Sequence, residues 1–286
     1  FLYIYKRLMI RKQNKLLGFY LPSFFRLHVE TKASLKDINK LSDIDFSVLL
    51  HEYIHFLQDI TTFYGLNNIH VTVEYMKYAN NFAIRGPSKQ FRVPIDPDPS
   101  NADNVLLNGH LNTLTYGDVD EINLKSIVNY QPLNLPIQIQ NPFIKELEVF
   151  DIHFVDENGK NGIFTFGAGC IMESMAYLLE ELSCREHHKS SDVPYRVAQL
   201  LAEHIYPEFA LNKLNILALC DISLGVSNPA KYFIKTLEEW KSKTSVPQRP
   251  EILYEDFSNL TFSLNGNTKD AKNQLQKMVP VIKSQL

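Results

Sequence analysis

The sequence predicts an α+β fold that is dominated by helices, with a small β-sheet or hairpin and a C-terminal helical region. Helical spacing of apolar residues recurs along much of the chain, whereas alternating apolar and polar residues occupy only a few short segments. The chain has 286 residues, of which 45% are hydrophobic and 12% aromatic. This apolar content can form a sizeable core and excludes a disordered or fibrous protein.

The N-terminal part predicts strands followed by two helices. Residues 16–30 are rich in aromatic and aliphatic side chains, which is typical of one or two strands. Ser42 and Asp45 have the spacing of a capping box, and apolar residues then follow at helical spacing until Gly65 offers a stop. We expect a second helix over about residues 71–84.

Residues 94–142 interrupt this pattern. Segment 94–103 contains three prolines together with Asp, Ser and Asn, and Pro132, Pro136 and Pro142 follow. Because proline removes a backbone donor and breaks regular structure, we predict a loop-rich insertion over 94–142 with only short elements. It would separate two lobes, 1–93 with a helix and 143–286 with a hairpin and helices, of one domain covering 1–286.

The C-terminal part predicts a hairpin and then several helices. Residues 146–155 and 162–166 alternate in polarity around the turn Glu157-Asn158-Gly159-Lys160. Helical periodicity follows Gly169 and recurs in four later segments, at about 193–204, 209–224, 229–241 and 270–284.

Composition excludes several classes of protein. The net charge of −3 argues against a dedicated nucleic-acid binder. The sequence also lacks an apolar stretch of about 18 residues, which a membrane-spanning helix would need. Three cysteines without a C-x-x-C pair favour a reducing compartment, so we expect a cytoplasmic protein. The basic residues 1–15 leave a weak contact with a membrane or nucleic acid as one alternative. Phosphate-binding loops and a G-x-S-x-G motif are absent.

The sequence His51-Glu52-Tyr53-Ile54-His55 is an H-E-x-x-H motif inside the best-capped predicted helix. Residues four apart lie on one helix face, so both imidazoles can bind one ion at about 2.0–2.1 Å. Glu52 lies on the flank of that face, where a general base for metal-assisted hydrolysis is needed. The alternative is two ordinary histidines with an incidental glutamate.

H-E-x-x-H on a helix resembles the zincin metallopeptidases, and HEYIHFLQD is similar to stretches in uncharacterised bacterial proteins of that superfamily. The G-x-x-H that follows in metzincins is absent, because residues 56–59 are Phe-Leu-Gln-Asp. The resemblance therefore implies a gluzincin-like arrangement in a zincin-like fold. In gluzincins a glutamate on a later helix supplies the third metal ligand.

Glu173 is the best choice for that third ligand. It is the only acid in the first two turns of an otherwise apolar or small-residue helix, and burying such a carboxylate is costly unless it is paired or binds a metal. With Ala176 it forms a Glu-x-x-Ala pattern that resembles the gluzincin glutamate helix. Many gluzincins have an aspartate one turn later that orients a histidine ligand, whereas this chain has Tyr177. The alternative for Glu173 is an exposed acid near a helix N-terminus.

Other polar residues have weaker arguments. We expect Glu180 and Glu181 to be solvated, and Asp221 to be either a support for a histidine ligand or a helix cap. An edge strand of the hairpin 146–166 is a possible place for a substrate strand. A transition-state donor is also required, but 14 tyrosines give no basis for choosing one.

The sequence thus predicts a zinc-dependent hydrolase, and specifically a metallopeptidase acting on a peptide or protein substrate. His51, His55 and Glu173 would bind Zn²⁺, and Glu52 would be the general base. The alternative from another class is a non-catalytic zincin-like binding or regulatory protein whose metal is structural or lost.

Overall fold

The computed structural model describes residues 17–85, 95, 103–137, 146–243 and 245–264. It has mixed helices and small sheets, so the predicted α+β class is confirmed; the zincin-like fold stays a prediction. The predicted basic arm of residues 1–15 and the predicted helix at 270–284 lie outside the described residues.

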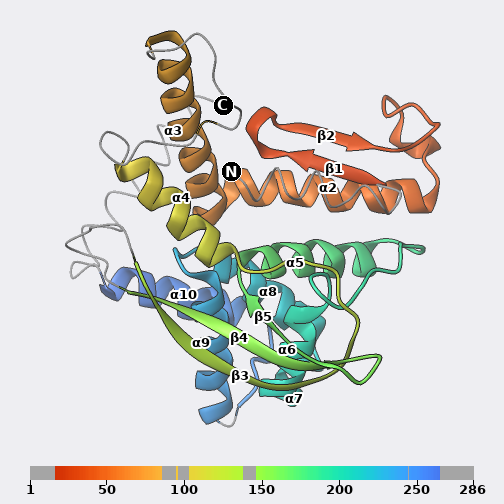
Figure 1. The fold of residues 1–286 in the computed structure, drawn as a ribbon. Helices are drawn as coiled ribbons and strands as arrows, with labels where there is room; N and C mark the ends of the chain where they lie inside the picture. Colours follow the sequence, from red (N-terminus) through yellow and green to blue (C-terminus); the bar gives the residue numbers. More distant parts are fainter. Residues whose placement is uncertain (1–16, 86–94, 96–102, 138–145, 244, 265–286) are drawn as a thin grey trace.

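The N-terminal unit, residues 17–85, is a β-hairpin on a long helix followed by a projecting helix (Figure 1). β1 (Gly18–Leu21) pairs antiparallel with β2 (Arg26–Val29), and both strands pack on α2 (Asp43–Thr61). The short 3-10 helices η1 (Pro22–Phe24) and η2 (Ile38–Lys40) join these elements. The predicted strands in residues 16–30 are therefore confirmed.

Local signals determine both ends of α2. The Ser42 hydroxyl accepts a hydrogen bond from the Asp45 backbone N–H at 3.1 Å, as the capping pattern predicts. The helix ends at Thr61, before the predicted stop at Gly65. A Cβ on Gly65 would overlap the last turn of α2, so this glycine instead permits α3 (Phe63–Arg85) to start close against α2.

The prediction of a loop-rich stretch over 94–142 is wrong where the structure describes it. α4 (Asp103–Tyr116) and β3 (Leu124–Pro136) occupy much of it. β3 contains Pro132 and Pro136, and it forms the outer strand of the sheet β3–β4–β5. Proline lacks a backbone donor but is tolerated on an edge strand, which explains why the proline pattern misled the prediction.

The predicted hairpin is confirmed as β4 (Glu146–Asp156) and β5 (Asn161–Phe166), paired antiparallel. One face of β4 presents Phe150, Ile152 and Phe154 to the helices that follow. Alternation along the strand thus places the apolar residues on the core side of the sheet.

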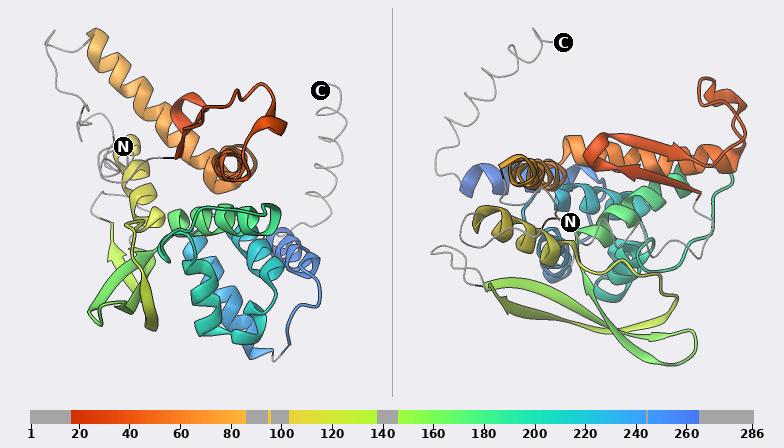
Figure 2. Two further views of the ribbon diagram at one scale, coloured as in Figure 1. Left: turned by 90° about the vertical axis from the view of Figure 1, so that its right-hand side faces the viewer. Right: turned by 45° about the horizontal axis from the view of Figure 1, so that its top comes forward.

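Helices fill the rest of the C-terminal unit, which we define as residues 146–264 (Figure 2). They are α5 (Ala168–Ser183), α6 (Val197–Ile205), α7 (Pro207–Ala210), α8 (Lys213–Leu224), α9 (Pro229–Ser242) and α10 (Glu251–Leu264). The predicted helix at 209–224 is divided into α7 and α8, and α10 was not predicted. α6 starts at Val197 and not at Val193, because Val193 exchanges two backbone hydrogen bonds with Ile122.

α5 connects the two units. It packs along α2 on one side and against α8 on the other (Figures 1 and 2). Eleven of its residues are buried, including Glu173 and Glu180. None of the described helices combines the length and the apolar character that a membrane span requires. The α2–α5 contact is the place where the predicted metal-binding residues meet.

Candidate metal centre

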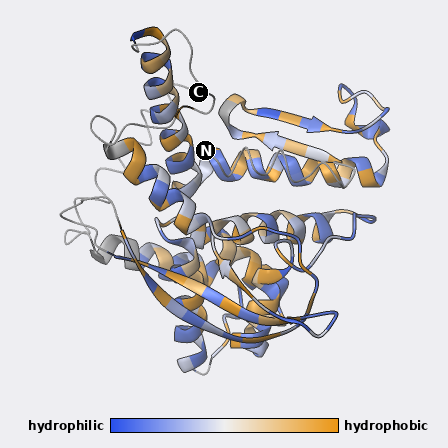
Figure 3. Ribbon diagram, viewed as in Figure 1, coloured by the Kyte–Doolittle hydropathy of each residue, from blue (hydrophilic) through white to orange (hydrophobic). Residues whose placement is uncertain are grey.

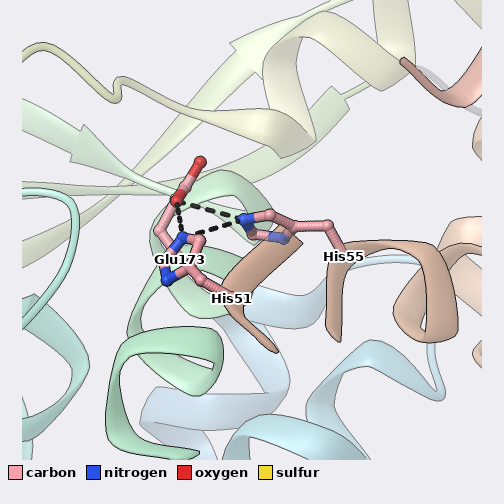
Figure 4. A group of neighbouring side chains, drawn as sticks. All are labelled: His51, His55 and Glu173. Carbon is pink, nitrogen blue, oxygen red and sulfur yellow. Dashed lines mark hydrogen bonds and ion pairs between the residues drawn. The ribbon is translucent and has the colours of Figure 1, made fainter. Parts of the chain in front are cut away.

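α2 and α5 bring His51, His55 and Glu173 together (Figure 4). The helical spacing places the two imidazoles on one face of α2, and Glu173 faces them from the second turn of α5. His51 Nε2, His55 Nε2 and Glu173 Oε2 form a triangle whose three sides are each 3.2 Å. These residues form a group that can hold a metal ion.

Both imidazoles use their second nitrogen to contact a side chain. His51 Nδ1 lies 3.2 Å from Glu180 Oε2, and His55 Nδ1 lies 2.8 Å from Gln58 Oε1. Gln58 also donates from Nε2 to the Met172 carbonyl oxygen at 3.0 Å, which connects α2 to α5. With Nδ1–H donating to each oxygen, the neutral form of each imidazole would present the lone pair of Nε2 to a metal ion.

The site is strongly anionic around His51. The Glu173 side chain is 2% exposed, that of Glu180 is 5% exposed and that of His51 is 12% exposed. Burial alone lowers the pKa of His51, but hydrogen bonds to Glu173 and Glu180 outweigh it and raise this pKa to about 10 in the metal-free protein. The prediction that Glu180 is solvated is therefore wrong. Glu181, in contrast, pairs with Lys213 at 2.7 Å and is partly exposed.

Glu52 is buried beside this group, with 7% of the residue exposed. Its negative charge acts on His51, and the first strand lies close to it: a Cβ on Gly18 would be 3.0 Å from Glu52 Cγ. Within the part of the chain that the structure describes, no hydrogen bond or ion pair involves the Glu52 carboxylate. Its environment thus differs from that of Glu173 and Glu180.

Aromatic residues border the His51 side of the site. The Tyr195 ring centre lies 5.8 Å from that of His51, and the Tyr177 ring is 6.2 Å from Tyr195. The Ser174 hydroxyl, fully buried next to Glu173, donates to the Pro194 carbonyl at 2.9 Å and accepts from the Ala198 N–H at 3.2 Å. The segment that carries Tyr195 is therefore attached to the helical turn that carries Glu173.

Two other predicted contributions lie elsewhere. Asp221 accepts a hydrogen bond from the Tyr254 hydroxyl at 2.8 Å, so it connects α8 to α10 and supports no histidine ligand. The hairpin β4–β5 packs against α4 and α9, whereas β1 and β2 are the strands on α2. A substrate strand along β4–β5 therefore gains no support from its position.

Sequence reasoning missed three neighbours of the site, namely Gln58, Glu180 and Tyr195. Two of them carry a periodic signal. Gln58 is three residues after His55 on α2, and Glu180 is seven residues after Glu173 on α5, so each shares a helix face with a proposed ligand. Tyr195 has no such signal, because a loop brings it back to the site.

No family model matches the chain, and neither the curated proteins nor the solved structures give a match. The resemblance to zincins therefore depends on the motif and on the geometry of the residues described above.

Proposed function

We propose that the protein is a zinc-dependent metallopeptidase that hydrolyses a peptide bond. The observation that carries the proposal is the combination of three convergent donors with a buried, unbonded Glu52 carboxylate beside them, among the described residues. A purely structural site needs only the ligands. Glu52 is buried, its charge acts on His51, and its carboxylate has no hydrogen bond or ion pair among the described residues, so it is available as a general base.

The donor set fits zinc. Two imidazoles and one carboxylate are common in catalytic zinc sites, where the fourth position is left to water or substrate. Ligand atoms at about 2.0–2.1 Å from a tetrahedral zinc ion lie about 3.3–3.4 Å from one another. The three donor atoms here are 3.2 Å apart, so a zinc ion requires only a small outward movement.

A bound zinc ion would supply Lewis acidity and lower the pKa of a coordinated water to about 7. The residues of this chain perform the proton transfers. Glu52 accepts a proton from the attacking water and later donates it to the leaving amine. His51, His55 and Glu173 hold their positions through the packing of α2 on α5 and through Gln58 and Glu180.

The test compares Glu52→Gln with wild type, using a mixture of fluorescence-quenched peptides and measuring zinc by mass spectrometry. We expect hydrolysis to fall by about 10²- to 10⁴-fold, as for loss of a general base, with one zinc retained. Glu157→Gln, in the exposed β4–β5 turn, is the control and should leave hydrolysis unchanged. Full activity of Glu52→Gln would refute the mechanism, and zinc binding without cleavage by wild type would favour the binding-protein alternative.

A further inference from the structure

His51 is contacted by two carboxylates of the same helix. Its Nε2 lies 3.2 Å from Glu173 Oε2, and its Nδ1 lies 3.2 Å from Glu180 Oε2. Residues seven apart on an α-helix are separated by about two turns and point in nearly the same direction. α5 thus presents one carboxylate to each nitrogen of a single imidazole.

His55 receives a different kind of support. Its Nδ1 contacts the neutral amide oxygen of Gln58 at 2.8 Å, and the same amide donates to the Met172 carbonyl. The geometry of the two histidines is alike, since each uses Nδ1 outward and Nε2 toward Glu173. They differ in the charge of the group that contacts Nδ1, which is a carboxylate for His51 and a neutral amide for His55.

The position of Glu180 is energetically demanding. Its side chain is 5% exposed, and a buried carboxylate is costly unless it is paired and hydrogen-bonded. In the described residues, the recorded side-chain partner of the Glu180 carboxylate is His51. The neighbouring Glu181 does not carry this cost of burial, because its carboxylate is partly exposed and pairs with Lys213.

The position one turn after Glu173 does not provide this support. It is occupied by Tyr177, whose ring packs edge-on against His187 at 5.6 Å and lies beside Tyr195. The acid that contacts His51 Nδ1 comes instead from the next turn of α5. Glu180 is the residue that the geometry places there.

We propose that Glu180 is a positioning residue of the metal centre. Its carboxylate accepts the Nδ1 proton of His51, which directs Nε2 to the metal position, and its negative charge strengthens this one imidazole as a donor. The assignment depends on the proposed metal site. It implies that the two histidine ligands differ in their supporting partner, which is the carboxylate of Glu180 for His51 and the neutral amide of Gln58 for His55. An anionic partner increases the basicity of a metal-binding histidine.

The experiment measures zinc affinity by competition with a chromophoric chelator in wild type, Glu180→Gln, Glu180→Ala and Glu181→Gln. Loss of such a supporting partner typically costs 10- to 100-fold in metal affinity. We expect that loss for Glu180→Ala, a smaller but measurable one for Glu180→Gln, which keeps an acceptor oxygen but no charge, and none for Glu181→Gln. Wild-type affinity in both Glu180 variants would overturn the assignment.

A second measurement separates positioning from general destabilisation. In the Co²⁺-substituted protein, the visible ligand-field bands report the donors, and thermal unfolding of the same sample reports stability. Both Glu180 variants should shift these bands in samples that remain folded at the measuring temperature; unchanged bands would assign a merely structural role. Neither measurement requires turnover. A wild-type protein that binds zinc but cleaves no peptide would therefore refute the proposed function while leaving the assignment of Glu180 intact.

Discussion

The N-terminal and C-terminal units differ sharply in how they are stabilised. The C-terminal unit contains many fully buried large side chains, among them Phe150, Phe166, Phe209 and Phe233. The main core cluster takes only Tyr64 from described residues of the N-terminal unit. α3 carries hydrophobic residues among hydrophilic ones along its length, and Leu66 and Ile84 are exposed (Figure 3).

The three proposed metal ligands therefore come from parts of the molecule that differ in packing. Glu173 belongs to a helix buried in the main core, whereas His51 and His55 belong to a unit with little core of its own. Contacts across α2 and α5, including those of Gln58 and Glu180, hold the histidines in place. If the proposed site binds a metal, the metal should therefore stabilise the N-terminal unit more than the C-terminal unit.

The largest effect should come from the core of the C-terminal unit. Phe233→Ala removes a fully buried ring that packs against Phe166, and it should lower the free energy of unfolding by about 3–5 kcal/mol. Leu66→Ala on α3 is the contrasting variant, since this side chain is 52% exposed, and it should change stability by less than about 0.5 kcal/mol. Urea denaturation measures both. Similar losses would contradict the comparison.

Removing the metal should affect the N-terminal unit selectively. At a free zinc concentration of about 100 times the dissociation constant, chelation should lower stability by about 2.7 kcal/mol. Hydrogen–deuterium exchange in α2 should be faster in the chelated protein than in the zinc-bound protein, whereas exchange in α8 and α9 should be nearly unchanged. Uniform deprotection of all helices would show that the units do not differ in this respect. Glu173→Ala should reproduce the exchange pattern of the chelated wild type and bind no zinc.

Acidification should weaken metal binding. The pKa of His51 is raised to about 10 in the metal-free protein, so its imidazole is protonated at neutral pH and must lose a proton to bind a metal. Zinc affinity should therefore fall by about tenfold, or 1.4 kcal/mol, for each unit of decreasing pH below that value. Calorimetry in buffers of different ionisation enthalpy measures the released proton. Zinc affinity that does not vary between pH 6 and 8 would exclude this linkage.

The smallest effect should come from the start of α2. Ser42→Ala removes the side-chain acceptor for the Asp45 N–H and should cost about 1 kcal/mol, detected by thermal unfolding. Ser42→Asp is the matched control, because it restores an acceptor and should recover most of the loss. Equal stability of Ser42→Ala and wild type would indicate that packing on α5 alone sets the stability of α2.

Local signals made the central part of the site predictable. The cap at Ser42, the helical spacing and the H-E-x-x-H motif all lie within one helix, and Glu173 was identifiable as an acid on an apolar face. Glu180 shares the helix face of Glu173, but its burial depends on the packing of α2 on α5, so the sequence did not distinguish it from a solvated acid. β3 was missed for a similar reason, since its prolines are tolerated only because the strand lies at the sheet edge.

The Ser174 hydroxyl has a consequence for how a substrate can enter. Because it joins the Tyr195 segment to the turn of α5 next to Glu173, a displacement of that segment would disturb the turn that carries this proposed ligand. α2 and the β1–β2 hairpin, in contrast, lack a large core that resists displacement. If the proposed substrate requires the site to widen, we expect the movement in α2 and the β1–β2 hairpin and not in the Tyr195 segment.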